Sequence, residues 1–538
     1  MKTLVCVLSL FLSALPALAD DYLRQPGIDA QHYVFRIALT GENEEIAGEA
    51  TVSLRFVRPG VSRVWLDFAA PKAGKGMTVS SVSSDGAAVT YTHEGERLTL
   101  ALPSPPNAGE TRNFTIRYRG TAAAGLHFGR NRYGDRTVFS WNWPTFAREW
   151  LPVIDHPSDK ATSEFEVTAP AHYQVVANGA LVEIRDLENH RRMTHWRESV
   201  PIASWLNNIG VAEFAMRSFD VVGGVPLQTW VFPRDRDNGM VTFEGPMRQA
   251  LEFFSEFIGP YPYEKLASVQ VNGMGGGMEH ASAVFYGEKE VTVQPAFSLV
   301  AHEISHQWWG DSVTESDWDD AWLSEGFATY FAALAQEHYQ GHDAFIDTMS
   351  RSRLAILQME KKAAVPVIHN NLADIHTGRA PIGLVYQKGG WFLHMLRSQL
   401  GDVAFRDGIR EYYRRFRDGN ASTDDLQRAM EEKSGQDLRS FFAQWLRRGT
   451  SPVIEGRWSY DAAGRRVMVE IEQTQPGEPF RLSLGIGVSR PGGGLAIARL
   501  LTDSKSTRQE FPCDQEPAVV TLDPEIQTLM EARFHKKQ

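Results

Sequence analysis

The stretch VAHEISHQWWGD (residues 300–311) places two histidines four residues apart, with a glutamate directly after the first. On a helix, His302 and His306 lie one turn apart and about 40° apart around the axis, so both imidazoles can reach one ion. Glu303 then points beside the ion rather than at it. The spacing predicts a metal-binding helix, and the alternative is an ordinary polar stripe on a soluble helix.

A third candidate ligand follows in DDAWLSEGFATYFAAL, a second amphipathic segment that contains Glu325. Two imidazoles, one carboxylate and an open fourth position are the ligands of a catalytic zinc site. Zinc lowers the pKa of a water towards about 7, and Glu303 is placed to take the proton as that water attacks a carbonyl. We therefore expect one zinc ion. Asp319 and Asp320 are candidates for orienting a zinc-binding imidazole from outside the ligand set, although acids in a loop are usually only solvated.

Length and charge narrow the class of protein. A chain of 538 residues is too long for one compact core, so two to four domains are expected. The net charge of -11 argues against nucleic acid or an anionic membrane as the main partner. A small cationic substrate fits this charge better.

The first residues, MKTLVCVLSLFLSALPALADD, combine one lysine, a short apolar run and Ala-Leu-Ala before Asp20. This layout predicts a secretory signal peptide over residues 1–19, cleaved after Ala19, and the run is too short for a membrane span. The prediction is a periplasmic or secreted protein with no integral membrane segment after signal removal. Cys6 leaves with the signal, so Cys513 cannot form an internal disulfide.

Changes in hydrophobic period divide the remaining chain into three parts. Alternating segments such as HYVFRIAL and SEFEVTAP predict an antiparallel β domain over residues 20–215. Residues 216–450 show helical spacing and are expected to form the catalytic domain. Alternation returns over residues 451–538, which predicts a small C-terminal β-sandwich. The expected fold class is multidomain α+β.

Together, these motifs resemble a known family. HEISHQWWG and WLSEGFATY, with GGGMEH before them and VYQKGG after them, are similar to the aminopeptidase N family of gluzincin zinc metallopeptidases. The resemblance extends to AREWLPVIDHPSDKATSEFEVTAP and PIASWLNNIGVAEF, and so covers roughly residues 30–450. It implies a thermolysin-like, mainly helical catalytic domain, with zinc held by His302, His306 and Glu325 and with Glu303 as general base. The chain resembles a short form without the family's helical C-terminal domain, so access to zinc is more open or a dimer partner covers it.

The resemblance also implies residues that bind the substrate. Glu279 matches the glutamate that binds the free amino group, and Tyr386 matches the tyrosine that stabilises the oxyanion. An N-terminal amine, with a pKa of about 7.7 to 8.0, is largely cationic at neutral pH, so a partly desolvated carboxylate can select it. Gly276 and Gly277, followed by Met278, would let the backbone approach the substrate closely.

Two departures from the family pattern concern the substrate's first residue. His280 stands where the family segment has asparagine, so recognition of the amine is expected to be retuned. Trp141 and Trp143 occupy the positions where many relatives carry Gln-x-Glu. Tryptophan walls would favour an apolar or aromatic first residue, and the alternative is that both side chains simply pack.

The leading hypothesis is a zinc aminopeptidase acting on peptides with a free N-terminal amine. The alternatives are a zinc peptidase or epoxide hydrolase of the same family with altered end-selectivity, and a non-catalytic peptide-binding relative. The presence of Glu303 and Tyr386 beside a full ligand set argues against the last of these. The sequence leaves open the preferred first residue, the physiological peptide and the oligomeric state.

Overall fold

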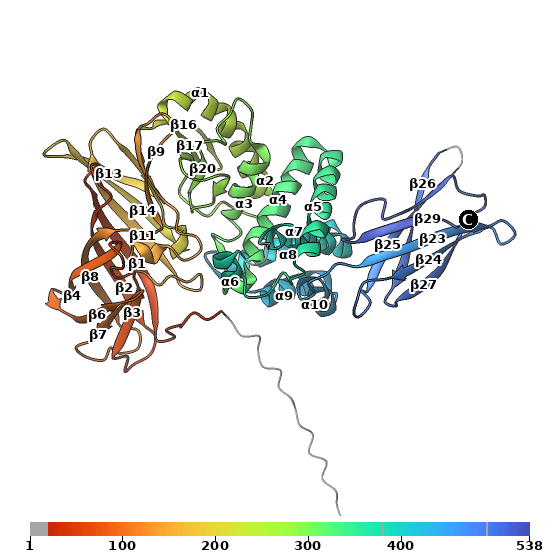
Figure 1. Cartoon of the computed structure of the whole chain (residues 1–538), viewed down its shortest axis with the longest axis horizontal. Helices are drawn as coiled ribbons and strands as arrows, with labels where there is room; N and C mark the ends of the chain where they lie inside the picture. Colours follow the sequence, from red (N-terminus) through yellow and green to blue (C-terminus); the bar gives the residue numbers. More distant parts are fainter. Residues whose placement is uncertain (1–19, 379–380, 491–492, 538) are drawn as a thin grey trace, which may run out of the picture.

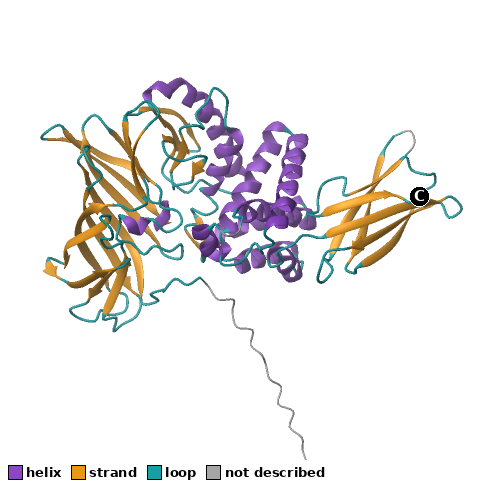
Figure 2. Cartoon of the chain, viewed as in Figure 1, coloured by secondary structure: helices purple, strands orange, loops and turns teal. Residues whose placement is uncertain are grey.

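The computed structural model describes residues 20–378, 381–490 and 493–537, so the predicted signal peptide lies outside the described residues. A helical part lies between two parts built of strands (Figures 1 and 2). None of the helices in the described residues combines the length and the hydropathy needed to cross a lipid bilayer.

An eight-stranded sheet forms most of the N-terminal part. Its order is β13 (Ala180–Leu187), β14 (Arg191–Ala203), β11 (Lys160–Pro170), β1 (Ile28–Leu39), β2 (Ile46–Phe56), β8 (Thr111–Thr121), β4 (Gly76–Ser84) and β5 (Ala87–Ala88). The buried residues alternate along β11, as the sequence pattern predicts. The antiparallel prediction fails at one place, because β1 and β11 run parallel. The chain leaves this sheet after β8 and returns beside β1 only after forming other strands.

Two smaller sheets complete this part. One has the order β12 (Gln174–Ala177), β15 (Ile209–Ala212), β10 (Arg136–Ser140) and β9 (Leu126–Arg130), and the other β3 (Arg63–Asp67), β7 (Arg97–Ala101) and β6 (Thr90–Glu94). Two short helices, η1 (Ala147–Glu149) and η2 (Ser204–Leu206), join strands. The apolar side chains of the two smaller sheets share one core with the large sheet.

The middle part begins with a five-stranded sheet. Its order is β16 (Ala215–Val222), β17 (Val225–Val231), β18 (Leu266–Val271), β20 (Ala283–Gly287) and β19 (Gly277–Met278). Every residue of β18 and β20 is buried, which explains why their sequences do not alternate. β19 is the edge strand and pairs with β20.

Helices fill the rest of the middle part. They are η3 (Pro233–Asp235), α1 (Arg236–Gly239), η4 (Met240–Glu244), α2 (Gly245–Phe257), α3 (Phe297–His306), η5 (Trp318–Asp320), α4 (Trp322–Gln340), α5 (His342–Lys362), α6 (Asn371–Thr377), α7 (Gly383–Leu400), α8 (Asp402–Phe416), α9 (Thr423–Ser434) and α10 (Arg439–Leu446). Two short strands, β21 (Val313–Glu315) and β22 (Gly419–Ala421), pair in parallel between them. The inner face of α3 buries Val300, Ala301 and Ile304, which fixes the rotation of the helix about its axis.

Two sheets form the C-terminal part. One has the order β27 (Ser506–Pro512), β24 (Arg466–Gln473), β23 (Val453–Asp461) and β29 (Glu531–Lys536), and the other β26 (Leu495–Thr502), β25 (Leu482–Ser489) and β28 (Val519–Leu522). Their core is continuous with that of the helices. Cys513 is a free thiol. The predicted α+β class is confirmed, with a mainly helical part between two β parts.

Candidate active site

Three candidate ligand atoms from two helices lie close together. The Nε2 atoms of His302 and His306 in α3 lie 3.3 Å apart. The Oε2 atom of Glu325 in α4 lies 3.5 Å from the first and 3.3 Å from the second. Ligand atoms about 2.1 Å from one tetrahedral zinc ion would be about 3.4 Å apart, so this triangle has the size that zinc requires.

The charges around this triangle also fit a divalent cation. Glu279, Glu303 and Glu325 are all buried here, against two imidazoles. Burial alone would raise the pKa of Glu325. The charge of His306 and hydrogen bonds from the His302 and His306 rings nevertheless lower this pKa to about 2. Burial and the charge of Glu279 raise the pKa of Glu303. Three buried carboxylates need more positive charge than two imidazoles supply, and a Zn²⁺ ion would provide it.

The His306 ring is oriented by groups of its own helix end and of α4. Its Nδ1 lies 3.0 Å from the Trp309 carbonyl oxygen and 3.1 Å from Ser324 Oγ. An Nδ1–H that donates to the carbonyl leaves the Nε2 lone pair free for a metal. Neither partner was identified from the sequence, since a backbone carbonyl and a serine leave no motif.

The expectation that Asp319 and Asp320 orient an imidazole is not met by their contacts. Asp320 accepts hydrogen bonds from the Thr423 amide and hydroxyl, at 3.0 and 2.6 Å, and so fastens the start of α4 to α9. The Asp319 amide donates to Asp317 at 3.0 Å. For Asp320 the prediction is wrong, because the same carboxylate that could face a ring caps a helix instead.

Glu303 lies against the edge strand β19. A Cβ atom added at Gly277 would come within 2.4 Å of both Cγ and Cδ of Glu303, so only glycine leaves the space for this side chain. Gly277 pairs with Tyr286 of β20, which holds the strand in place. The general-base candidate is therefore positioned by contact between α3 and β19 and not by the helix alone.

Glu279 follows β19 and approaches the metal-ligand candidates. Its carboxylate and the ligand atoms of His306 and Glu325 lie within 4.8 Å of one another. Burial raises its pKa to about 7. Gln307 donates to the Glu279 carbonyl at 3.0 Å and to Asp311 at 2.8 Å.

The oxygen of the Gln307 side-chain amide makes a further contact with the turn that carries Glu279. Gln307 Oε1 accepts from the Ser282 amide at 2.8 Å, and Ser282 has a positive φ of 63°. Gln307 therefore joins the end of α3 to both sides of the turn that carries Glu279. Its position directly after His306 is the one signal in the sequence, and that signal does not reveal its partners.

Tyr386 reaches the site because α4 and α7 pack closely. A Cβ atom on Gly326 would lie 2.8 Å from backbone atoms of Gly389, so the two helices touch at glycines. The Tyr386 ring stacks on His302 with centroids 6.0 Å apart. Burial and the charge of Glu325 raise the pKa of Tyr386, so its hydroxyl stays protonated.

A cavity of about 640 Å³ opens beside Tyr386 and His302. It is lined by residues of α3, α4, α5 and α7, among them Arg351. Glu279 does not line this cavity. The cavity therefore does not include the amine-binding candidate.

The remaining candidates lie at the border with the N-terminal part. His280 is buried, its Nε2 lies 3.3 Å from the Ser140 carbonyl oxygen, and burial lowers its pKa to about 3. Trp143 packs edge-on against Trp318, with centroids 6.2 Å apart, whereas Trp141 is partly exposed. Within the described residues, no hydrogen bond or ring contact of these three side chains reaches His302, His306 or Glu325.

Gly276 and Met278 flank the strand residue that contacts Glu303. The Gly276 amide donates to Glu290 at 3.0 Å, and its φ of 72° favours glycine. Met278 is buried and pairs with Phe285. Both residues therefore shape the strand that borders the site.

Known proteins share both the sequence and the architecture of this chain. The model described as the peptidase family M1 domain matches residues 243–445, and that of the peptidase M1 N-terminal domain matches residues 29–206. A glutamyl aminopeptidase from Bitis rhinoceros is 23% identical over 85% of this chain and 50% of its own length. A probable aminopeptidase 1 from Sulfurisphaera tokodaii is 25% identical over 70% of this chain and 49% of its own length. The chain thus spans about half the length of the curated relatives it matches.

Two solved structures match over nearly all of their own length. A mutant M1 zinc metallopeptidase from Deinococcus radiodurans has 25% identity and a TM-score of 0.68, covering 81% of this chain and 97% of its own. A two-domain M1 zinc metallopeptidase mutant bound to L-arginine has 26% identity and a TM-score of 0.69, covering 79% and 95%. With both family domains matched in order, the chain belongs to peptidase family M1, the aminopeptidase N-like gluzincin zinc metallopeptidases.

Proposed function

We propose that the chain is a zinc-dependent aminopeptidase that hydrolyses the N-terminal peptide bond of peptides. One Zn²⁺ ion is held by His302, His306 and Glu325. The observation that carries the proposal is the triangle of ligand atoms, 3.3 to 3.5 Å on each side, with the Glu303 carboxylate buried beside it. Membership of a zinc metallopeptidase family and similarity to aminopeptidases support it.

Each remaining residue has a role that its place supports. When bound, zinc polarises the scissile carbonyl and lowers the pKa of the attacking water. The Glu303 carboxylate accepts the water's proton and passes it to the leaving amine. The Tyr386 hydroxyl donates a hydrogen bond to the developing oxyanion. The buried Glu279 carboxylate binds the substrate's ammonium group and so restricts cleavage to the first residue.

The separate positions of Glu279 and of the cavity beside Tyr386 suggest how the peptide lies. Its amine binds near Glu279, and the residues beyond the scissile bond enter the cavity beside Tyr386. Trp141 and Trp143 form walls of the pocket for the first residue of the peptide and favour an apolar or aromatic side chain there. The relatives do not indicate one preferred first residue, since some are called glutamyl aminopeptidase and one related structure is bound to L-arginine. Turnover of a substrate panel that varies only the first residue tests this preference.

The decisive experiment measures hydrolysis of aminoacyl fluorogenic substrates with and without a chelator. We expect turnover that a chelator abolishes and that zinc restores. Glu303→Gln keeps the size of the side chain and removes the base, so turnover should fall by a factor of about 10² to 10⁴ while zinc remains bound. Normal turnover in that variant would exclude Glu303 as the base.

The same assay separates the alternatives. Turnover of N-acetylated peptides or of lipid epoxides, with little activity on free-amine substrates, would identify a relative with altered selectivity. Peptide binding without turnover of any substrate would identify a non-catalytic relative.

We also propose that the protein is exported to the periplasm or the medium, with the signal peptide removed by cleavage after Ala19, and that its domains span residues 20–215, 216–450 and 451–538. Cell fractionation tests the location, and limited proteolysis tests the boundaries.

A further inference from the structure

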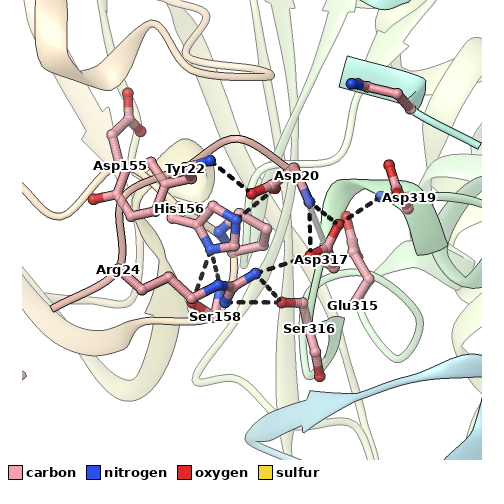
Figure 3. Close-up of polar contacts among 12 residues, drawn as sticks. Asp20, Tyr22, Arg24, Asp155, His156, Ser158, Glu315, Ser316, Asp317 and Asp319 are labelled. Atoms are coloured by element: carbon pink, nitrogen blue, oxygen red, sulfur yellow. Dashed lines mark hydrogen bonds and ion pairs between the residues drawn. The ribbon is translucent and has the colours of Figure 1, made fainter. Parts of the chain in front are cut away.

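The first described residues cross from the N-terminal part to the catalytic part (Figure 3). The Asp20 amide nitrogen lies 3.4 and 3.3 Å from the two carboxylate oxygens of Asp317. Arg24 donates to the same carboxylate at 2.9 Å and to the Ser316 carbonyl at 3.3 Å. Residues 20–24 therefore form a strap, whose two ends both contact the loop that precedes α4.

The strap is anchored on its other side to the N-terminal part. Asp20 Oδ2 lies 2.8 Å from His156 Nε2, and both side chains are only 1% exposed. The Tyr22 ring stacks on His156 at 4.6 Å, and its hydroxyl donates to Asp67 at 2.6 Å. These contacts hold the Asp20 nitrogen at a fixed position, directed at Asp317.

Asp317 connects this strap to α4, the helix that carries Glu325. Its side chain accepts from the Asp319 amide and so caps η5, which runs directly into α4. Glu325 lies in the first turn of α4. Any group that fixes Asp317 therefore fixes the start of the helix that carries a zinc-ligand candidate.

The surroundings of the Asp20 nitrogen are short of positive charge. Asp20, Asp317 and Asp319 gather here, and Arg24 is the guanidinium that pairs with Asp317 (Figure 3). Burial and the charges of Asp317 and Asp20 raise the pKa of Asp319 to about 7. Asp319 Oδ1 is buried and has no hydrogen-bond partner among the described residues. A cation at the Asp20 nitrogen would offset part of this negative charge.

We propose that cleavage after Ala19 creates an α-ammonium group on Asp20 that pairs with Asp317 and fastens the mature N-terminus to the start of α4. A signal endopeptidase adds water across the Ala19–Asp20 amide, which leaves a carboxylate on Ala19 and the ammonium on Asp20. A neutral nitrogen with one proton becomes a cation with three. The inference depends on the proposed export processing and not on the peptidase activity.

A double-mutant cycle tests the ion pair. Two chains that end at Gln538 are compared, one that begins at Asp20 and one that begins at Ala19. Each is made with Asp317 and with Asp317→Asn. The Asp20 form should melt at least about 2 °C higher than the Ala19 form, and Asp317→Asn should abolish that difference. Equal melting temperatures for the two forms, or an unchanged difference in the Asp317→Asn background, would overturn the ion pair. Asp21→Asn, which removes an exposed neighbouring charge, is the matched control and should preserve the difference.

Three further measurements keep the test decisive. Acetylation of the Asp20 amine removes its charge without changing Asp317, so it should lower the melting temperature even if Asp317→Asn fails to fold. Hydrogen exchange over residues 316–324 should be slower in the Asp20 form than in the Ala19 form, and equal rates would count against fastening of α4. Mass spectrometry of the exported protein should find Asp20 as the first residue, and another first residue would refute the processing step while leaving the aminopeptidase proposal intact.

Discussion

Replacing Gly277 by alanine should displace the general base while leaving the metal ligands in place. The added Cβ would stand 2.4 Å from Glu303 Cδ, whereas contacts below 3.4 Å are already tight. The carboxyl group must therefore move by about 1 Å, or β19 must move away from α3. A misplacement of about 1 Å at a reacting group can cost about 10²-fold in rate. We expect kcat to fall by about that factor.

The measurement is kcat on an aminoacyl fluorogenic substrate, with zinc content determined on the same sample. Gly275→Ala is the matched control, because a Cβ there meets no atom within 4 Å and the residue has no positive φ. Gly275→Ala should retain most of its kcat, and both variants should retain zinc. A normal kcat in Gly277→Ala, or an equal loss in Gly275→Ala, would refute the idea that this contact positions Glu303.

Further predictions concern the ligands and the elements that hold them. Glu325→Gln should lose most of its bound zinc, as measured by elemental analysis, because the neutral amide is a weaker ligand for a divalent cation. Gln307→Met should raise KM for free-amine substrates more than it lowers kcat, since it releases the backbone of Glu279; a loss in kcat alone would contradict this role. Gly326→Ala should destabilise the fold by about 1–3 kcal/mol, seen as a lower melting temperature, because the new Cβ meets backbone of Gly389 at 2.8 Å. Removing zinc with a chelator should lower the melting temperature, and adding zinc should restore it.

The sequence predicts the helix that carries His302 and His306 well because its signal is local. Spacing along one helix decides whether His302 and His306 share a face, and the buried apolar residues Val300, Ala301 and Ile304 fix which face that is. The three-part α+β organisation was also predictable, because a change from period two to helical spacing marks each transition. Glu325 needed more information, namely that two amphipathic helices pack with these faces together.

Other features have no local signal. The parallel pairing of β1 with β11 cannot be read from alternation, which is the same for parallel and antiparallel neighbours. The contact of Gly326 with Gly389 joins helices far apart in the chain, so the proximity of Tyr386 to Glu325 followed only from the family resemblance. Asp320 illustrates the reverse error, since its carboxylate accepts from Thr423 at the start of α9, a partner 103 residues away that no local pattern reveals.

Charge balance explains how one site can serve both zinc binding and selection of the substrate's amine. Glu279, Glu303 and Glu325 are buried within one group of side chains, and burial of unpaired carboxylates is costly. A divalent cation would compensate the two carboxylates nearest the imidazoles, and the third would remain available for an ammonium ion. A peptide with a free amine supplies that charge, whereas an N-blocked peptide leaves Glu279 either ionised without a partner or protonated. On the proposed function, selectivity for free N-termini therefore follows from the number of buried carboxylates as much as from the shape of the pocket.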